Sequence, residues 1–137
     1  MIFNKTSEYA IRVMVFLADN SEARYSVNSL HKRLNIPYKY LGRLMSKMAS
    51  AGLVDVSHGK QGGFQINSKR EPIYIHEIIS LVEDLNNYDR CVLGFSECFD
   101  ENPCSMHQIW AKKKDEIKKI IHETSLDDIK NVKDVKY

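Results

Sequence analysis

Three cysteines lie close together in the second half of the sequence and are the residues with the clearest chemical potential. Cys91, Cys98 and Cys104 are separated by six and five residues, and His107 follows three positions after the last of them. Thiolate sulfur is the usual protein ligand of iron–sulfur clusters, and a residue of another type can complete the set. The segment therefore predicts a loop that wraps an iron–sulfur cluster, either [2Fe-2S] or [4Fe-4S].

Two other uses of these residues stay open. Three cysteines and a histidine can also bind zinc. In zinc modules, however, two to four residues usually separate the cysteines of a pair, whereas six residues separate Cys91 from Cys98. A metal-free switch needs only two thiols that form a reversible disulfide. A structural disulfide framework is not expected, because the chain has three cysteines and cytosolic thiols stay reduced.

Charge is distributed unevenly along the 137 residues, although the net charge is only +2. Residues 23–70 contain nine Lys or Arg and one acid, whereas residues 71–137 contain nine Lys or Arg and fourteen Asp or Glu. A basic half next to an acidic half indicates a polyanionic partner for the first half only. We therefore expect double-stranded DNA to bind there.

The sequence shows no sign of a membrane segment, a secretion signal or a catalytic site. No 18 apolar residues run together, and charged and polar residues occur from the start of the chain. A glycine-rich phosphate loop and a nucleophile elbow are both missing, and acidic pairs such as Glu83–Asp84 are expected on solvated faces. We expect a cytoplasmic protein that is not an enzyme and has no membrane partner.

The residues before the cysteines predict a helix-turn-helix followed by a β-hairpin. Apolar residues at helical spacing predict a first helix over 6–20. Ser26 is a suitable N-cap for a short second helix, and Pro37 is suited to open a third helix that Gly52 ends. Two short alternating strands are expected on either side of a glycine-rich turn at 57–63. This order is that of a winged helix, so the expected fold is mainly α with a small β-hairpin wing.

A helix over 75–85 and a longer one after the cysteines complete the chain. Apolar residues recur along the longer helix at near-heptad spacing, at Met106, Trp110, Ile117 and Ile120. Such a stripe beyond a compact domain has to be covered, so we expect a homodimer formed through it, the alternative being that it packs against the first helix of the same chain. The predicted divisions are a winged helix-turn-helix DNA-binding domain at 1–85, a cysteine-rich cluster loop at 86–104, the dimerisation helix at 105–123 and a polar tail at 124–137.

The third helix and the wing carry the residues expected to contact DNA. In a helix-turn-helix the N-terminal part of the second helix of the motif enters the major groove. Arg43 shares a face with Lys39 and can bind guanine through O6 and N7. The expected DNA contacts are Tyr38, Lys39, Tyr40, Arg43 and Lys47 in the helix, and His58, Lys60 and Gln61 in the wing.

Beyond these patterns, the sequence resembles the Rrf2 family of bacterial winged-helix regulators. The resemblance rests on residues 6–10, 40–44, 51–54 and 58–64 and on the three-cysteine loop, in this order. It implies a homodimer in which each cysteine loop lies near the partner's first helix. It also implies a cluster held by the three cysteines and one ligand of another type.

For this fourth ligand the resemblance offers two candidates. In IscR-like members it is a histidine three residues after the last cysteine, which His107 matches. In NsrR-like members it is an acidic residue near the N-terminus of the partner chain, which Glu8 matches. Three departures stand out: the first cysteine gap is one residue longer than in the commonest pattern, His58 stands where the wing often carries arginine, and Gly42 lacks a side chain that some relatives use to contact bases.

Together these features predict a DNA-binding transcription regulator, acting as a repressor. Its operator affinity is expected to be controlled by an iron–sulfur cluster that senses iron, redox state or nitric oxide. The alternative is a cluster-free winged-helix regulator that senses thiol oxidation or a small metabolite.

Overall fold

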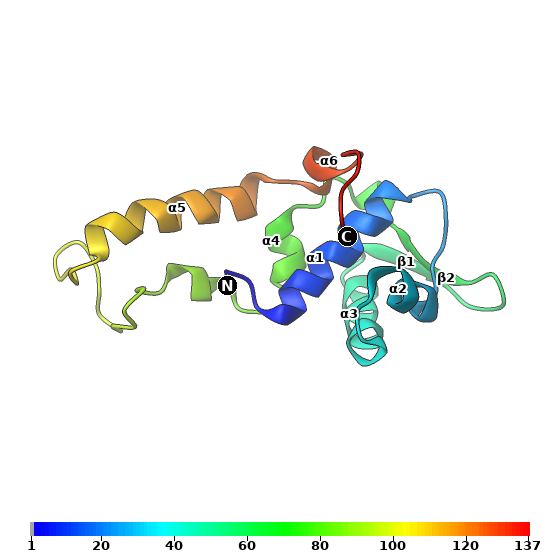
Figure 1. The fold of residues 1–137 in the computed structure, drawn as a ribbon, viewed down its shortest axis with the longest axis horizontal. Helices are drawn as coiled ribbons and strands as arrows, with labels where there is room; N and C mark the ends of the chain where they lie inside the picture. Colours follow the sequence, from blue (N-terminus) through cyan, green and yellow to red (C-terminus); the bar gives the residue numbers. More distant parts are fainter. Residues whose placement is uncertain (1) are drawn as a thin grey trace.

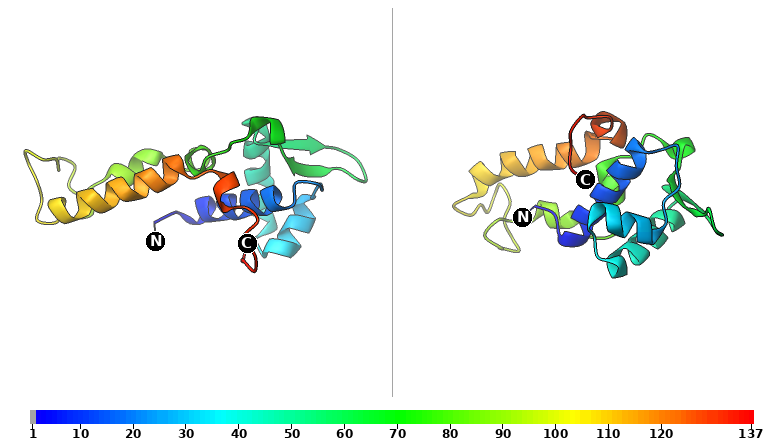
Figure 2. Two further views of the ribbon diagram at one scale, coloured as in Figure 1. Left: turned by 90° about the horizontal axis from the view of Figure 1, so that it is seen from above. Right: turned by 45° about the vertical axis from the view of Figure 1, so that its right-hand side comes forward.

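The winged helix and the cysteine loop lie at opposite ends of an elongated molecule (Figures 1 and 2). The computed structural model describes residues 2–137. It is mostly helical with one antiparallel two-stranded hairpin, which confirms the predicted fold class. In chain order the elements are α1 (Lys5–Asp19), α2 (Val27–Leu34), α3 (Tyr38–Ser50), β1 (Val54–Ser57), β2 (Gly63–Ile66), the 3-10 helix η1 (Ser68–Arg70), α4 (Ile75–Ile79), the 3-10 helix η2 (Leu85–Asp89), α5 (His107–Glu123) and α6 (Leu126–Ile129).

The helix-turn-helix is defined by its caps. The Ser26 hydroxyl accepts the backbone N–H of Ser29 at 3.1 Å and so starts α2. After α3 the chain turns at Gly52, whose φ of 76° is the left-handed conformation that glycine adopts without strain. There the N–H of Leu53 donates to the carbonyl of Met48 at 3.0 Å, which closes a Schellman motif. Both caps agree with the sequence-based prediction.

The hairpin begins directly after this turn and forms the wing. Its register runs from Val54 opposite Ile66 to Ser57 opposite Gly63. Tyr25 adds a single bridge on the other side of β2 through reciprocal backbone hydrogen bonds of 2.9 and 2.8 Å with Phe64. A Cβ on Gly63 would lie 2.7 Å from the carbonyl oxygen of Tyr25, so only glycine permits this approach.

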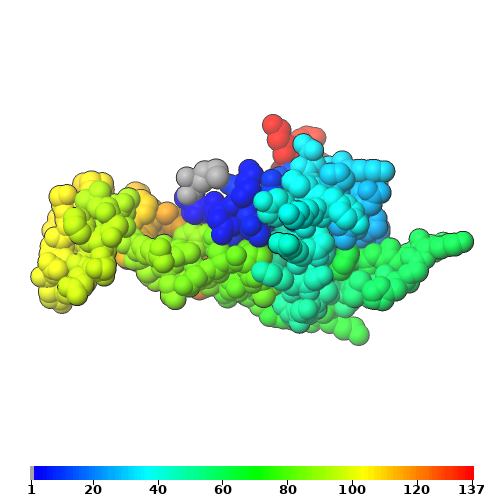
Figure 3. Space-filling model, turned by 90° about the horizontal axis from the view of Figure 1, so that it is seen from below, coloured from blue at the N-terminus to red at the C-terminus, as the bar shows by residue number. Residues whose placement is uncertain are grey.

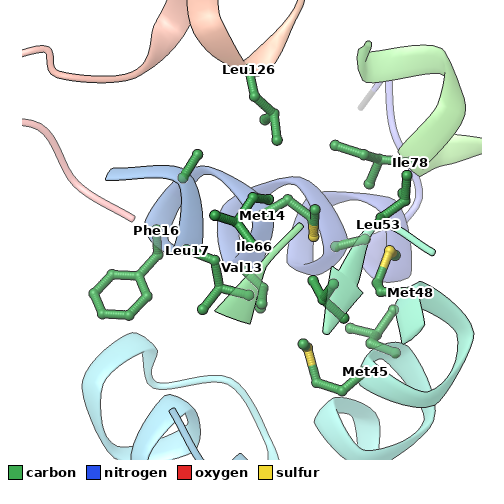
Figure 4. Packing of buried hydrophobic residues seen from close by; sticks show 14 of the residues in the cluster. Val13, Met14, Phe16, Leu17, Met45, Met48, Leu53, Ile66, Ile78 and Leu126 are labelled. Atoms are coloured by element: carbon green, nitrogen blue, oxygen red, sulfur yellow. The ribbon is translucent and has the colours of Figure 1, made fainter. Parts of the chain in front are cut away.

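The core surrounds α1 (Figure 4). Met14 and Leu17 are completely buried there and meet apolar side chains from α3, the hairpin, α4 and α6. The labelled members of this core are Val13, Met14, Phe16, Leu17, Met45, Met48, Leu53, Ile66, Ile78 and Leu126. No helix within residues 2–137 has the length and apolar character needed to cross a membrane.

The helix predicted over 75–85 is shorter than expected, because α4 ends at Ile79. The next N–H groups, those of Leu81 and Val82, bond to carbonyls three residues earlier, so the chain tightens into turns. The carboxylate of Asp84 then accepts the N–H of Asn86 at 2.9 Å and caps η2. The apolar periodicity continued through this region, but local side-chain caps interrupt the helix.

The last segment returns to the winged helix and docks on α1. Leu126 of α6 is buried, and the Tyr137 ring packs edge-on against Phe16 with centroids 5.3 Å apart. The Tyr137 hydroxyl donates to Asp19 at 2.6 Å. Arg12 of α1 donates to the carbonyl of Tyr137 at 2.8 Å. These contacts fix the end of the chain against the domain that carries α2 and α3.

Gly42 in the interior of α3 offers a prediction about stability. A Cβ at this position would meet nothing within 4 Å, and a glycine inside a helix destabilises it by about 0.5–1 kcal/mol relative to alanine. Gly42→Ala should therefore raise the free energy of unfolding by about that amount, measured by urea denaturation followed by circular dichroism. The matched control is Gly63→Ala, which should lower the free energy of unfolding because its Cβ would clash with the carbonyl of Tyr25. A Gly42→Ala protein that is less stable than the wild type would contradict this explanation.

Candidate nucleic-acid interface and metal centre

The exposed face of α3 presents aromatic and basic side chains to solvent. Tyr38 and Tyr40 are 57% and 47% exposed, although both are large hydrophobic residues. Each tyrosine packs against a neighbouring ring. The ring centroids of Tyr40 and Tyr9 of α1 are 5.8 Å apart, and those of Tyr38 and His31 of α2 are 6.2 Å apart. These contacts orient the tyrosines at the start of α3, the part of the helix that enters a major groove.

The cations of this face have no acidic partners. Among residues 2–137, Lys39, Arg43 and Lys47 form no ion pair with a carboxylate. On α5, by contrast, Lys118 binds Asp89 at 2.8 Å, and Lys113 and Lys119 also contact carboxylates. Within the described residues the three cations of α3 are therefore not neutralised by carboxylates, which favours their binding to a phosphate backbone.

The wing adjoins α3 at the same end of the molecule (Figure 3). The predicted wing residues His58, Lys60 and Gln61 are all exposed near its tip. Arg24 was not predicted, yet its guanidinium lies 3.4 Å from the carbonyl of Gly63, the first residue of β2. Its position just before the Tyr25 bridge, within the basic half of the sequence, was the only available signal.

The three cysteines come together at the opposite end. Their Sγ atoms all lie within 4.8 Å of one another, and each residue is half-buried. Cys91 follows η2 and Cys104 precedes α5, and their sulfurs are 3.6 Å apart. Cys98 is brought in by the loop between them, where the N–H of Cys104 donates to its sulfur at 3.5 Å. The structure thus brings together all three predicted thiol ligands.

Two of these thiols have pKa values shifted in opposite directions. Desolvation opposes the Cys91 thiolate, but hydrogen bonds from the N–H groups of Phe95 and Leu93, and from the neighbouring thiols, lower its pKa to about 7. The Cys104 N–H favours the Cys98 thiolate, yet burial and the two adjacent thiols raise the pKa of Cys98 above its ordinary value. The lowered pKa of Cys91 favours its thiolate, which is the form of cysteine that binds metal.

His107, the first residue of α5, lies beside the triad. Its Nδ1 is 3.2 Å from the sulfur of Cys98, and its Nε2 is 3.0 Å from a carboxylate oxygen of Asp100. A carboxylate that holds one ring nitrogen in this way typically orients the other toward a metal. Asp100 was missed in the sequence, because nothing in its spacing distinguished it from other loop acids.

Glu8 is not near the triad of its own chain. It lies in the first turn of α1, where it contacts Lys5 at 3.1 Å. Figure 1 places this turn in the middle of the molecule, well away from the cysteine loop. Of the two predicted fourth ligands, only His107 is therefore next to the cysteines of the same chain.

The apolar stripe predicted along α5 divides between two faces. Trp110 lines a small pocket together with the three cysteines, His107, Val92, Ala111 and Lys114. Ile117 packs against the core cluster. Met106 and Ile120 instead remain 37% and 62% exposed, and Ile109 beside them is 67% exposed. The prediction that all four residues form one outward stripe was wrong, because α5 uses Trp110 and Ile117 to contact its own chain.

A winged helix with an uncompensated basic helix and wing defines the class of helix-turn-helix DNA-binding proteins. Residues 3–131 match the model of the Rrf2 family, described as iron-dependent transcriptional regulators. An HTH-type transcriptional regulator of Aquifex aeolicus is 31% identical over 98% of this chain and 94% of its own length. The HTH-type transcriptional regulator IscR of Escherichia coli is 27% identical over 98% of this chain and 83% of its own.

Solved structures agree with this assignment. T. potens IscR superposes with a TM-score of 0.68 and 27% identity over 93% of this chain and 84% of that one. CymR, the global cysteine regulator of B. subtilis, shares the fold with a TM-score of 0.73 and 24% identity over 93% and 94% of the two chains. The chain belongs to the Rrf2 family and is a DNA-binding transcription regulator, not an enzyme.

Proposed function

We propose that this chain is a homodimeric repressor whose affinity for its operator is set by an iron–sulfur cluster bound at Cys91, Cys98 and Cys104. The observation that carries the proposal is the convergence of the three Sγ atoms within 4.8 Å of one another. The donor set suits the group, because three thiols and an imidazole are ligands that iron–sulfur clusters accept. When bound, such a cluster supplies a link among three chain segments that is sensitive to iron, oxidation and nitric oxide.

His107 is the fourth ligand that we propose. Its Nδ1 lies 3.2 Å from Cys98, and Asp100 fixes the ring by accepting from the other nitrogen. In this role His107 couples the loop to α5, since it is the first residue of that helix. Glu8 can serve only if a second chain brings it to the loop. Iron content of His107→Ala and Glu8→Ala proteins distinguishes the two ligands.

We propose that the second copy covers the exposed apolar side chains of α5 and the loop. Ile109 and Ile120 are 67% and 62% exposed on one side of α5, and Phe95 and Phe99 of the loop are 60% and 49% exposed. Large apolar side chains left exposed on a loop and on the helix that follows it indicate an interface rather than a free surface. Two half-sites on DNA also require a two-fold pair of reading helices.

This interface leads to a prediction about assembly. A double substitution, Ile109→Glu with Ile120→Glu, places like charges in the proposed contact and should raise the dimer dissociation constant about tenfold or more. Sedimentation velocity over a concentration series measures it. Val132→Glu, at a residue 52% exposed on the tail, is the matched control and should leave assembly unchanged. A wild-type chain that sediments as a monomer would contradict the prediction.

The distance between the two sites shapes the mechanism. The cysteine loop and α3 lie at opposite ends of one chain (Figure 1). Within the chain the signal has to pass from the loop along α5 to α4 and α1, which pack on one another and on the core. We propose that Cys104 and His107, which lie at the start of α5, hold this helix in one orientation when the cluster is bound. That orientation sets the spacing of the two DNA-binding domains in the dimer.

The test is composition and colour under anaerobic conditions. Protein prepared without oxygen, or reconstituted with ferrous iron and sulfide, should contain both elements and absorb in the visible range. Colourless protein that takes up neither element would refute cluster binding while leaving the DNA-binding role intact.

A thiol switch is the second candidate, favoured by one specific observation. The Cys91 and Cys104 sulfurs are 3.6 Å apart, and Cys91 has a pKa lowered to about 7. A thiolate next to a thiol is suited to reversible disulfide formation. Mass spectrometry of peroxide-treated apo-protein identifies this bond, and operator binding that depends on it in iron-free protein would favour the switch over the cluster.

A further inference from the structure

The indole of Trp110 carries a buried N–H group that has no acceptor. Within residues 2–137, Nε1 of Trp110 is one of three buried side-chain polar atoms without a hydrogen-bond partner. The other two, in Ser7 and His76, lie on α1 and α4. Only Trp110 belongs to the pocket lined by the cysteines. Because buried indole N–H groups normally find a partner, the orphan points to an acceptor that enters this pocket.

The other residues of the pocket offer no such acceptor. Val92 and Ala111 are apolar, and the ammonium of Lys114 is a donor that already binds the carbonyl of Asp89 at 3.1 Å. Both ring nitrogens of His107 face Cys98 and Asp100. The cysteine sulfurs themselves accept nothing from the indole. The side chains that line the pocket therefore leave Nε1 of Trp110 without an acceptor.

We propose that Trp110 is a positioning residue for the iron–sulfur cluster, and that its indole N–H donates a hydrogen bond to a sulfur atom of that group. The inference rests on the proposed function and adds a contact that the ligand set does not include. A hydrogen bond to sulfur favours the reduced cluster and so raises its reduction potential. The ring also covers one side of the pocket and limits solvent access.

The test uses the fact that Trp110 is the single tryptophan of the chain. Its fluorescence should fall when anaerobic apo-protein is reconstituted with ferrous iron and sulfide. Trp110→Phe keeps an aromatic ring but removes the donor. This protein should bind the same amount of iron and sulfide, show a lower reduction potential by spectroelectrochemistry, and lose its visible absorption in air about two- to tenfold faster.

Two controls separate this role from simple packing. Ser96→Ala changes an exposed residue of the same loop that has no place in the pocket or the proposed interface, and it should alter neither potential nor lifetime. In the iron-free state Trp110→Phe should be at least as stable to heat as the wild type, because an unsatisfied donor has been removed. An unchanged reduction potential and lifetime of the cluster in Trp110→Phe would overturn the inference. So would a loss of thermal stability that is the same in the iron-free and the iron-loaded variant. A wild-type chain that takes up no iron would refute the proposed function and this contact together.

Discussion

Cys98→Ala protein prepared without oxygen is expected to contain no bound iron or sulfide, whereas the wild type contains both. The reason is the central position of Cys98: its sulfur is the one that contacts both the ring of His107 and the backbone N–H of Cys104. Its removal leaves two thiols and one imidazole, one sulfur short of the proposed ligand set. Iron and sulfide analysis with visible absorption measures the effect, and operator affinity should become insensitive to added iron.

Ser96→Ala provides the control for loop substitution. Ser96 is exposed in the same loop and contributes no sulfur, so this protein should keep its iron. If Cys98→Ala bound as much iron as Ser96→Ala, the three-sulfur site would not be the place where iron binds.

Arg43→Ala is expected to weaken operator binding about 5- to 150-fold and to relax the base preference at one position of each half-site, since a bidentate arginine–guanine contact contributes about 1–3 kcal/mol. Arg43 is exposed on α3 and has no carboxylate partner within residues 2–137, so its guanidinium is free to bind a base edge. Fluorescence anisotropy against wild-type and single-substituted operators, at one fixed salt concentration, measures both effects.

Two lysines give the comparison for Arg43. Lys47→Ala should weaken binding to all sequences alike and reduce the salt slope by about one, as expected for a phosphate contact. Lys119→Ala, on α5 and paired with Glu123, should change nothing. Equal losses on matched and mismatched operators for Arg43→Ala would mean that this residue contacts phosphate rather than a base.

The winged helix was predictable because its signals are local. Ser26 and Gly52 act as caps through hydrogen bonds to residues a few positions away, and their residue types are nearly diagnostic. The hairpin followed from alternation and glycines. The close approach of Gly63 to Tyr25 did not, because it joins residues 38 positions apart in sequence.

Features that depend on tertiary contacts were less accessible. The apolar periodicity continued past Ile79, but α4 ends there in tight turns, and Asp84 caps a separate 3-10 helix. Heptad spacing placed Trp110 in the outward stripe, whereas α5 turns it toward the cysteine pocket. A repeat of apolar residues indicates that a helix face is buried, but it does not indicate which segment or which chain buries it.

At the candidate metal site, the spacing of the cysteines predicted that their sulfurs come together but did not predict the residues around them. Cys91, Cys98 and Cys104 converge as predicted. Asp100 could not be identified, since a single acid in a loop carries no pattern of its own, and the spacing of Trp110 assigned it to the apolar stripe instead of to the cysteine pocket. Surrounding residues of this kind orient ligands and tune a bound metal group, so the structure adds what the spacing omits.

The most direct measurement is the operator affinity of one anaerobic preparation before and after its iron is removed by a chelator. We expect the affinity to change at least about fivefold at constant salt, in the range of typical coupling between two sites, and to be restored when the cluster is reconstituted. Identical affinities for the iron-loaded and iron-free protein would contradict the claim that Cys91, Cys98 and Cys104 control DNA binding.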